Sequence, residues 1–171
     1  MDRSIVKSYA NIAIIKYWGK KDPIKMIPAT SSISLTLENL FTETEISFIS
    51  REEAIEKTGQ ASDLLYINGE LQNEEQIKKI AKVVNLFRDD GSQLVKIDTT
   101  NNMPTEAGLS SSSSGLSAAI KACNKLFDKN LSREELAQIS KFASGSSSRS
   151  FLDQLECGIK TQERFQKLKL I

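Results

Sequence analysis

The sequence predicts an α+β domain, because strand patterns come first along the chain and helical patterns follow. Residues 5–15, 32–37 and 42–48 are rich in β-branched residues or alternate polar and apolar side chains, as strands do. Asn68-Gly69 between two short apolar runs is typical of a hairpin with a type I′ turn. Strands followed by helices, rather than alternating with them, favour α+β over parallel βαβ units.

Helical periodicity predicts three helices after the hairpin. The expected helices run from Asn73 to Asp90-Gly91, through Leu116 and Leu126, and from the capping box at Ser132 to Phe142. A further strand is expected at residues 94–98. Residues 51–62 are polar and predict a surface loop, Pro23 and Pro28 bracket another loop, and Asn11 interrupts the first strand.

The composition fits one globular domain and excludes several kinds of chemistry. The chain has 171 residues and a formal net charge of +1, so charge gives no argument for binding nucleic acid or a membrane surface. Histidine is absent, which removes Ser-His-Asp and Cys-His nucleophile systems and histidine metal sites. Two cysteines, Cys123 and Cys157, are too few for a zinc cluster or a disulfide framework. Without an apolar signal segment or a long apolar run, the chain is expected to be cytoplasmic.

A serine-rich segment, residues 104–115, carries the clearest chemical signal. Small residues between a strand and a helix let backbone N–H groups approach an anion, and the helix N-terminus adds positive potential. Serine hydroxyls can also bind phosphate oxygens or a magnesium-bound water. The segment is too short for a flexible linker, but the residues alone do not decide between phosphate binding and a simple helix cap.

Two other segments suit anions as well. Residues 10–21 contain three lysines with Tyr17 and Trp18, a set that could grip a diphosphate. Residues 143–150 surround Arg149 with serine hydroxyls, and arginine binds carboxylates and phosphates bidentately. Taken singly, these segments are more simply a solvated charge run and a polar loop. Three such segments in one nearly neutral domain favour an anion site.

The same segments resemble the motifs of a known family. Asn-Ile-Ala-Ile-Ile-Lys-Tyr-Trp-Gly-Lys (residues 11–20) and Ser-Gly-Ser-Ser-Ser-Arg-Ser (144–150) are similar to motifs of the diphosphomevalonate decarboxylase family. Pro-x-x-x-Gly-Leu-Ser-Ser-Ser (104–112) resembles the phosphate loop of the wider GHMP kinase superfamily. For residues 1–151 the resemblance implies the GHMP-kinase N-terminal domain (ribosomal protein S5 domain 2-like). That domain is a mixed or antiparallel sheet with helices on one side, and the C-terminal domain of the family is missing.

The resemblance also implies a reaction. ATP phosphorylates the tertiary 3-hydroxyl of mevalonate 5-diphosphate, phosphate then leaves, and carbon dioxide is lost to give isopentenyl diphosphate. The expected cofactors are therefore ATP and the Mg²⁺ that accompanies it, with no metal held by a protein side-chain cluster. For the full-length family a homodimer is expected, with no nucleic-acid or membrane partner.

The roles of individual residues follow from matching those motifs. Arg149 is expected to meet the substrate carboxylate, oriented by Asn11, while Lys16 adds positive potential. The expected substrate-binding residues are Tyr17, Lys20, Ser144, Ser146 and Arg149. The expected ATP-binding residues are Gly108, Leu109, Ser110, Ser111, Ser112 and Ser113.

The resemblance stops after Phe151, where relatives continue with aromatic-Gly-Pro and then Trp-Asp-Lys. Back-translating residues 151–164 with permitted codons and shifting the frame restores this continuation, including Trp-Asp-Lys. We therefore expect residues 152–171 to be an aberrant tail caused by one missing base. The alternative is a genuine amphipathic C-terminal helix.

Three functions compete on the sequence alone. The first is the decarboxylase by descent, and the second is a GHMP kinase that stops at phosphorylation, against which the Tyr17-Trp18-Gly19-Lys20 element argues. The third is a non-catalytic remnant or binding module. Relatives carry the aspartate near the reacting hydroxyl in a second domain, so we expect this chain to be inactive alone. Release of carbon dioxide from mevalonate 5-diphosphate with ATP would separate the three.

Glu106 departs from the family, which usually has alanine there, and its carboxylate is expected to repel ATP phosphates. The Glu106→Ala variant should therefore bind ATP more tightly, by about threefold or more, as measured by calorimetric titration. An unchanged or weaker affinity would count against this effect, as when a lysine or arginine neutralises Glu106 or Mg²⁺ bridges it to the phosphates.

Overall fold

The main sheet of the protein has seven strands, in the order β6-β5-β7-β4-β8-β9, with β1 also paired to β4. The computed structural model describes residues 2–15, 20–22, 27–28, 32–103, 111–143, 147–151, 156–158 and 165–167. The main-sheet strands are β1 (Arg3–Ile15), β4 (Ser32–Ile49), β5 (Leu64–Ile67), β6 (Glu70–Leu71), β7 (Leu94–Asn101), β8 (Glu156–Gly158) and β9 (Phe165–Lys167). Only β5 and β7 pair in parallel among these strands, so the sheet is mixed, as predicted.

Strand β4 is the centre of this sheet and corrects one prediction. The two strands expected at 32–37 and 42–48 are a single strand of 18 residues. The sequence pattern breaks because β1 shifts register against β4: Tyr9 pairs with Phe41, but Ala10 pairs with Leu37. Residues 38–40 are therefore bulged out of the β1 pairing, and a bulge interrupts alternation without ending a strand.

The bulge also explains why the sequence pattern predicted an interruption of the first strand at Asn11. β1 continues unbroken through Asn11, but Ala10 and Asn11 are both buried, whereas Ile12 is exposed. A regular strand would turn every second side chain to the opposite face, placing Asn11 on the outer face with Tyr9. The register shift beside Tyr9 instead directs Asn11 to the helix side of the sheet.

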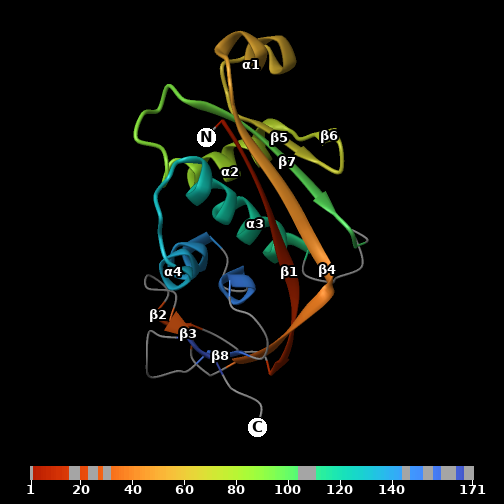
Figure 1. Ribbon diagram of the computed structural model, residues 1–171, viewed down its shortest axis with the longest axis vertical. Helices are drawn as coiled ribbons and strands as arrows, with labels where there is room; N and C mark the ends of the chain where they lie inside the picture. Colours follow the sequence, from red (N-terminus) through yellow and green to blue (C-terminus); the bar gives the residue numbers. More distant parts are fainter. Residues whose placement is uncertain are drawn as a thin grey trace.

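Helices α2, α3 and α4 lie on one side of the sheet, as predicted, whereas α1 extends beyond the end of β4 (Figure 1). The helical elements are α1 (Arg51–Thr58), α2 (Glu74–Val84), α3 (Ser111–Leu126), α4 (Arg133–Ala143) and the short 3-10 helix η1 (Ser147–Phe151). A separate two-stranded sheet is formed by β2 (Lys20–Asp22) and β3 (Ile27–Pro28). No helix within the described ranges is both long and apolar enough to cross a membrane.

Local signals placed most of the helix boundaries correctly. Asn73 caps α2 by accepting a hydrogen bond from the Gln76 backbone N–H at 3.0 Å. Ser132 and Glu135 form the predicted capping box, with Glu135 Oε2 accepting from the Ser132 N–H at 2.8 Å. The Asn68-Gly69 turn is confirmed by positive φ angles of 52° and 83°.

Two helix predictions were wrong. The polar segment 51–62, expected to be a loop, contains α1, which begins after the cap Ser50 and ends at Gly59 with φ of 74°. Its residues gave no helical stripe because only Ala54 is buried, so capping rather than an apolar face defines it. Helix α2 ends at Val84, well before Asp90-Gly91, and Phe87 fills the core from the turns that follow.

The core between sheet and helices includes Ile46 and Ile97 from the strands, Phe87, and Ile120 and Cys123 from α3. The outer face of β1 and β4 is polar at one end, where Arg3 and Lys7 each lie 3.4 Å from a glutamate of β4. Helix α3 is the central helix of the domain, because its residues Ile120 and Cys123 are fully buried in this core.

Burial raises the pKa of the Cys123 thiol from its ordinary value of 9.0 to about 12, with smaller opposing effects from the Arg88–Asp63 ion pair. In a Cys157→Ser variant, Cys123 should not react with a thiol reagent at pH 8 until urea unfolds the protein. Because the folded-state pKa is raised, the stability from this group is complete below pH 9 and is lost between about pH 9 and 12. Rapid labelling without urea would contradict this packing of α3.

Candidate functional site

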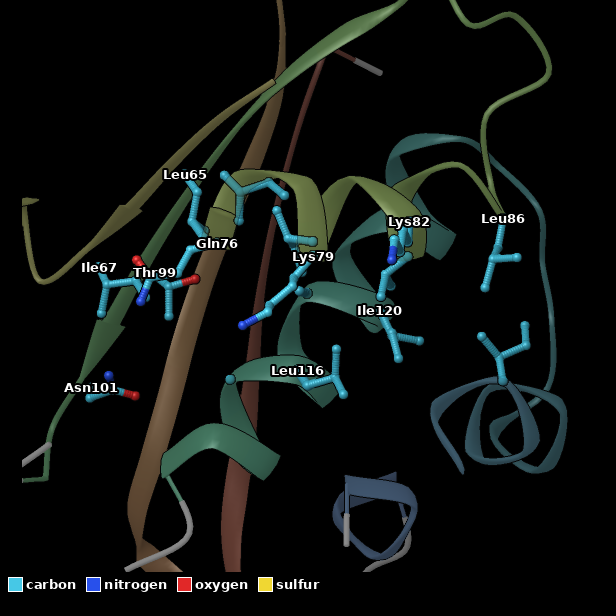
Figure 2. Close-up of a pocket in the computed structure, with 16 residues that line it drawn as sticks. Leu65, Ile67, Gln76, Lys79, Lys82, Leu86, Thr99, Asn101, Leu116 and Ile120 are labelled. Atoms are coloured by element: carbon cyan, nitrogen blue, oxygen red, sulfur yellow. The ribbon is translucent and has the colours of Figure 1, made fainter. Parts of the chain in front are cut away.

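A groove of about 700 Å³ lies between α2, the strands β5 and β7, and the first half of α3. Most of its lining is apolar, with Leu65, Ile67, Leu116 and Ile120 among the residues (Figure 2). Its polar lining residues are Gln76, Lys79, Lys82, Thr99 and Asn101. Figure 2 shows Lys79 extending from α2 into the space between β7 and α3. An apolar cleft with a few polar groups is typical of a small-molecule site.

The groove reaches the N-terminal end of α3. Helix α3 begins at Ser111, and Gly115 and Leu116 in its second turn line the groove. The positive dipole end of the helix therefore lies near one end of this cavity. The predicted order of strand, serine-rich segment and helix is confirmed, since β7 ends at Asn101 and α3 follows.

Helix α3 meets the strands through a row of buried hydroxyl groups. Thr42 Oγ1 of β4 donates to Asn101 Oδ1 at 2.6 Å, and it lies 2.7 Å from Ser114 Oγ. Since the Thr42 proton is used on Asn101, Ser114 donates to Thr42. Ser117 Oγ lies 2.5 Å from Ser8 Oγ of β1 and donates to the Ser114 carbonyl at 3.0 Å. These serines hold the helix on the sheet.

A second polar cluster joins β1, α3 and η1. Asn11 Nδ2 donates to Ser150 Oγ at 2.7 Å, and both residues are buried. Lys121 Nζ of α3 donates to the Ser150 carbonyl at 2.9 Å and to Ser8 Oγ at 3.2 Å. At its other end η1 is tied to α4, because the hydroxyls of Ser147 and Ser140 are hydrogen-bonded to each other. The segment that carries Arg149 is thus anchored on both sides.

Only part of the expected site falls in the described residues. The residues outside them are Lys16, Tyr17, Gly108, Leu109, Ser110, Ser144 and Ser146. For Lys20, Ser111, Ser112 and Arg149 the backbone alone is described, in β2, α3 and η1. Figure 1 shows β2 and the blue 3-10 helix η1 at the same end of the molecule. The convergence of Tyr17, Lys20, Ser144 and Arg149 on one pocket stays a prediction.

The two expected residues with described side chains are both buried on the helix side. Asn11 is bonded to Ser150, next to Arg149 in the chain. Ser113 has an exposed fraction of only 1%. Among the described side chains there is no group of three His, Cys, Asp or Glu suited to a metal.

Sequence reasoning missed the groove and the role of Lys121. The groove forms where three elements pack, and its one sequence signal is the pair Lys79 and Lys82 beside the apolar stripe of α2. The sequence signal for Lys121 is its position between Ile120 and Ala122, in an otherwise small or apolar stretch of α3. A lysine in such a stretch usually has a polar partner.

The mixed sheet, its one-sided helices and a groove ending at a serine-rich helix start define the N-terminal domain of a GHMP-type small-molecule kinase fold. The model of the diphosphomevalonate decarboxylase-like N-terminal domain matches residues 8–163. The chain therefore belongs to the diphosphomevalonate decarboxylase family, as its motifs predicted.

Individual relatives agree with this assignment. The mevalonate pyrophosphate decarboxylase of Streptococcus pyogenes is 54% identical with a TM-score of 0.86, over 99% of this chain and 52% of that one. A structure of MDDEF in complex with MVAPP, AMPPCP and magnesium is 37% identical with a TM-score of 0.77, over 94% of this chain and 47% of that one. The diphosphomevalonate decarboxylase of Candida albicans is 34% identical over 85% of this chain and 42% of its own length. This chain spans about half the length of these relatives.

The tail is described only in part. The family model extends past Phe151 to residue 163, and β8 and β9 are strands rather than a helix. Strand β8 pairs with residues Ser32–Ser34 of β4. The domain boundary at residue 151 and the frameshift stay predictions.

The hydroxyl row should be a measurable part of stability. Thr42→Val keeps the shape of the side chain but leaves Ser114 Oγ and Asn101 Oδ1 without this partner, so it should cost about 2 kcal/mol in urea unfolding. Thr100→Val, at an exposed position of β7, is the matched control and should change stability by about 0.5 kcal/mol or less. Equal effects of the two variants would show that the hydroxyl row does not hold α3.

Proposed function

We propose that this chain provides the nucleotide- and substrate-binding half of an ATP-dependent mevalonate 5-diphosphate decarboxylase. The observation that carries the proposal is the groove that ends at the serine-rich start of α3, in a chain that belongs to this family. The groove takes the nucleotide, and the end of the molecule around Asn11 and η1 takes the substrate.

The groove suits a nucleotide in both size and chemistry. Its volume of about 700 Å³ and apolar walls fit a purine and ribose, while Thr99 and Asn101 offer hydrogen bonds at the β7 side. Lys79 and Lys82 supply positive charge along α2. The positive dipole end of α3 would face the phosphates, so base and phosphates would each meet matching chemistry.

The Asn11–η1 region suits the other substrate. Arg149 belongs to the anchored segment η1, and an arginine can bind a carboxylate through two parallel hydrogen bonds. Asn11 reaches the same segment through Ser150. Lys20, with Tyr17, Ser144 and Ser146, would hold the diphosphate, and Lys16 would add positive potential. A related structure with MVAPP, AMPPCP and magnesium supports this pairing of a diphosphate substrate with a nucleotide.

The reaction needs the γ-phosphate of the nucleotide aligned with the 3-hydroxyl of the substrate. The γ-phosphoryl group passes from MgATP to the 3-hydroxyl, and the resulting 3-phosphate leaves as inorganic phosphate. The electrons of the C–C bond to the carboxylate carbon then form the new C=C double bond as carbon dioxide departs. Positive charge near the leaving phosphate, from Lys16 and the helix start, stabilises this step. Phosphoryl transfer depends mainly on such positioning and electrostatics.

Deprotonation of the 3-hydroxyl is assigned to a group in the half of the relatives that this chain does not span. We therefore expect the 171-residue chain to bind MgATP and mevalonate 5-diphosphate without turnover. Calorimetry should detect both ligands, whereas release of labelled carbon dioxide should stay at background. A chain extended to the length of its relatives should release it.

Each outcome has a distinct meaning. If the chain binds neither ligand, the proposed site is wrong. If the short and extended chains release carbon dioxide at comparable rates, a second half is not needed. Phosphorylated mevalonate 5-diphosphate accumulating without carbon dioxide release from the extended chain would indicate a kinase instead.

A further inference from the structure

We propose that Lys121 is a positioning residue that fixes the Arg149 segment, and thereby sets affinity for the carboxylate of the substrate. The inference rests on the proposed function, because it assumes that Arg149 meets that carboxylate. Neither the motifs nor the expected site residues include Lys121, which lies in the middle of α3, well away from the serine-rich start.

The contacts of Lys121 are concentrated on η1. Its Nζ donates to the Ser150 carbonyl at 2.9 Å, and it lies 5.1 Å from the centre of the Phe151 ring. A third contact, to Ser8 Oγ at 3.2 Å, ties the same ammonium to β1. One half-buried cation therefore joins α3, β1 and the two residues that follow Arg149.

The chemistry of these acceptors favours a clamp. A hydrogen bond from an ammonium to a carbonyl is stronger than one between neutral groups, and low local polarity strengthens it further. Phe151 has an exposed fraction of 1%, so it anchors the end of η1 in the core and adds a cation–π contact. A neutral side chain of the same length would keep the packing but lose the charged bond.

Two contacts between neutral side chains also hold η1. Ser150 Oγ accepts from Asn11, and Ser147 is bonded to Ser140 of α4. A five-residue 3-10 helix has few internal hydrogen bonds, so outside contacts determine its position. Because bidentate binding of a carboxylate tolerates little misplacement, small movement of this segment should reduce affinity.

Helix α3 also links the two binding regions. Lys121 lies roughly 15 Å along the helix axis from Ser111, at a rise of 1.5 Å per residue. The start of the helix faces the nucleotide groove, and Lys121 holds the substrate segment. Loss of the clamp should affect the substrate and spare the nucleotide, since Ser8 and Ser150, to which Lys121 donates, do not line the groove.

The test compares Lys121→Met with Lys121→Arg, which can still donate to the Ser150 carbonyl. The control is Lys125→Met, an exposed lysine one turn further along α3. Calorimetry would measure three ligands: mevalonate 5-diphosphate, isopentenyl diphosphate, which lacks the carboxylate, and Mg-AMPPCP. Lys121→Met should reduce the affinity for mevalonate 5-diphosphate about tenfold. It should change the affinity for each of the other two ligands by about twofold or less.

The arginine variant should recover most of the affinity, and Lys125→Met should bind like the wild type. An equal loss of affinity for isopentenyl diphosphate or Mg-AMPPCP in Lys121→Met would overturn the proposal, since it would indicate a general loss of structure. Unchanged affinity for mevalonate 5-diphosphate in Lys121→Met would overturn it as well.

A second measurement is independent of ligand binding. Trypsin cleavage after Arg149, followed by mass spectrometry, reports the opening of η1. Lys121→Met should accelerate this cleavage about tenfold relative to Lys125→Met, and an equal rate would reject the clamp. If the wild type binds none of the ligands, the proposed function is wrong for this chain, and the cleavage rate still decides whether Lys121 holds η1.

Discussion

The rest of this structure depends on the pairing of the hydroxyl groups buried between helix α3 and the sheet. Helix α3 lies on β1 and β4 with Ser114, Ser117 and Lys121 turned toward Ser8 and Thr42, and all of these groups are hydrogen-bonded. Apolar contacts are non-directional and tolerate sliding, whereas an unpaired buried hydroxyl is costly. Pairing therefore fixes both the rotation of α3 and its position along the sheet.

This fixed helix gives the domain two binding regions. On one side, Gly115 and Leu116 close the end of an apolar groove beside the first turn of the helix. On the other side, Lys121 and Ser8 hold η1 through the Ser150 carbonyl. One helix then positions both binding regions, and phosphoryl transfer depends on such positioning of its two reactants.

Local features of the fold could be predicted from the sequence because their causes are local. The Asn68-Gly69 hairpin and the capping box at Ser132 need only a few adjacent residues, and both were correct. The errors arose where distant pairing decides. The bulge that keeps β4 continuous depends on β1, and α1 is set by its caps in the absence of an apolar stripe.

The site was predictable only as far as motifs reach. Short motifs identified the family and named Asn11, but not the register shift that turns Asn11 toward Ser150. The groove could not be predicted, because its walls come from α2, β5, β7 and α3, which meet only in the folded protein. Lys121 has no motif at all, and its importance appears only once η1 lies beside it.

The central claim is that α3 positions a nucleotide region near its start relative to a substrate region at η1. A crystal structure of this chain with mevalonate 5-diphosphate, AMPPCP and Mg²⁺ would test it directly. The account predicts the nucleotide base in the groove between α2 and β7, its phosphates at Ser111, and the substrate carboxylate beside Asn11 and Arg149. A nucleotide outside the groove, or a substrate carboxylate away from Asn11 and Arg149, would contradict the account.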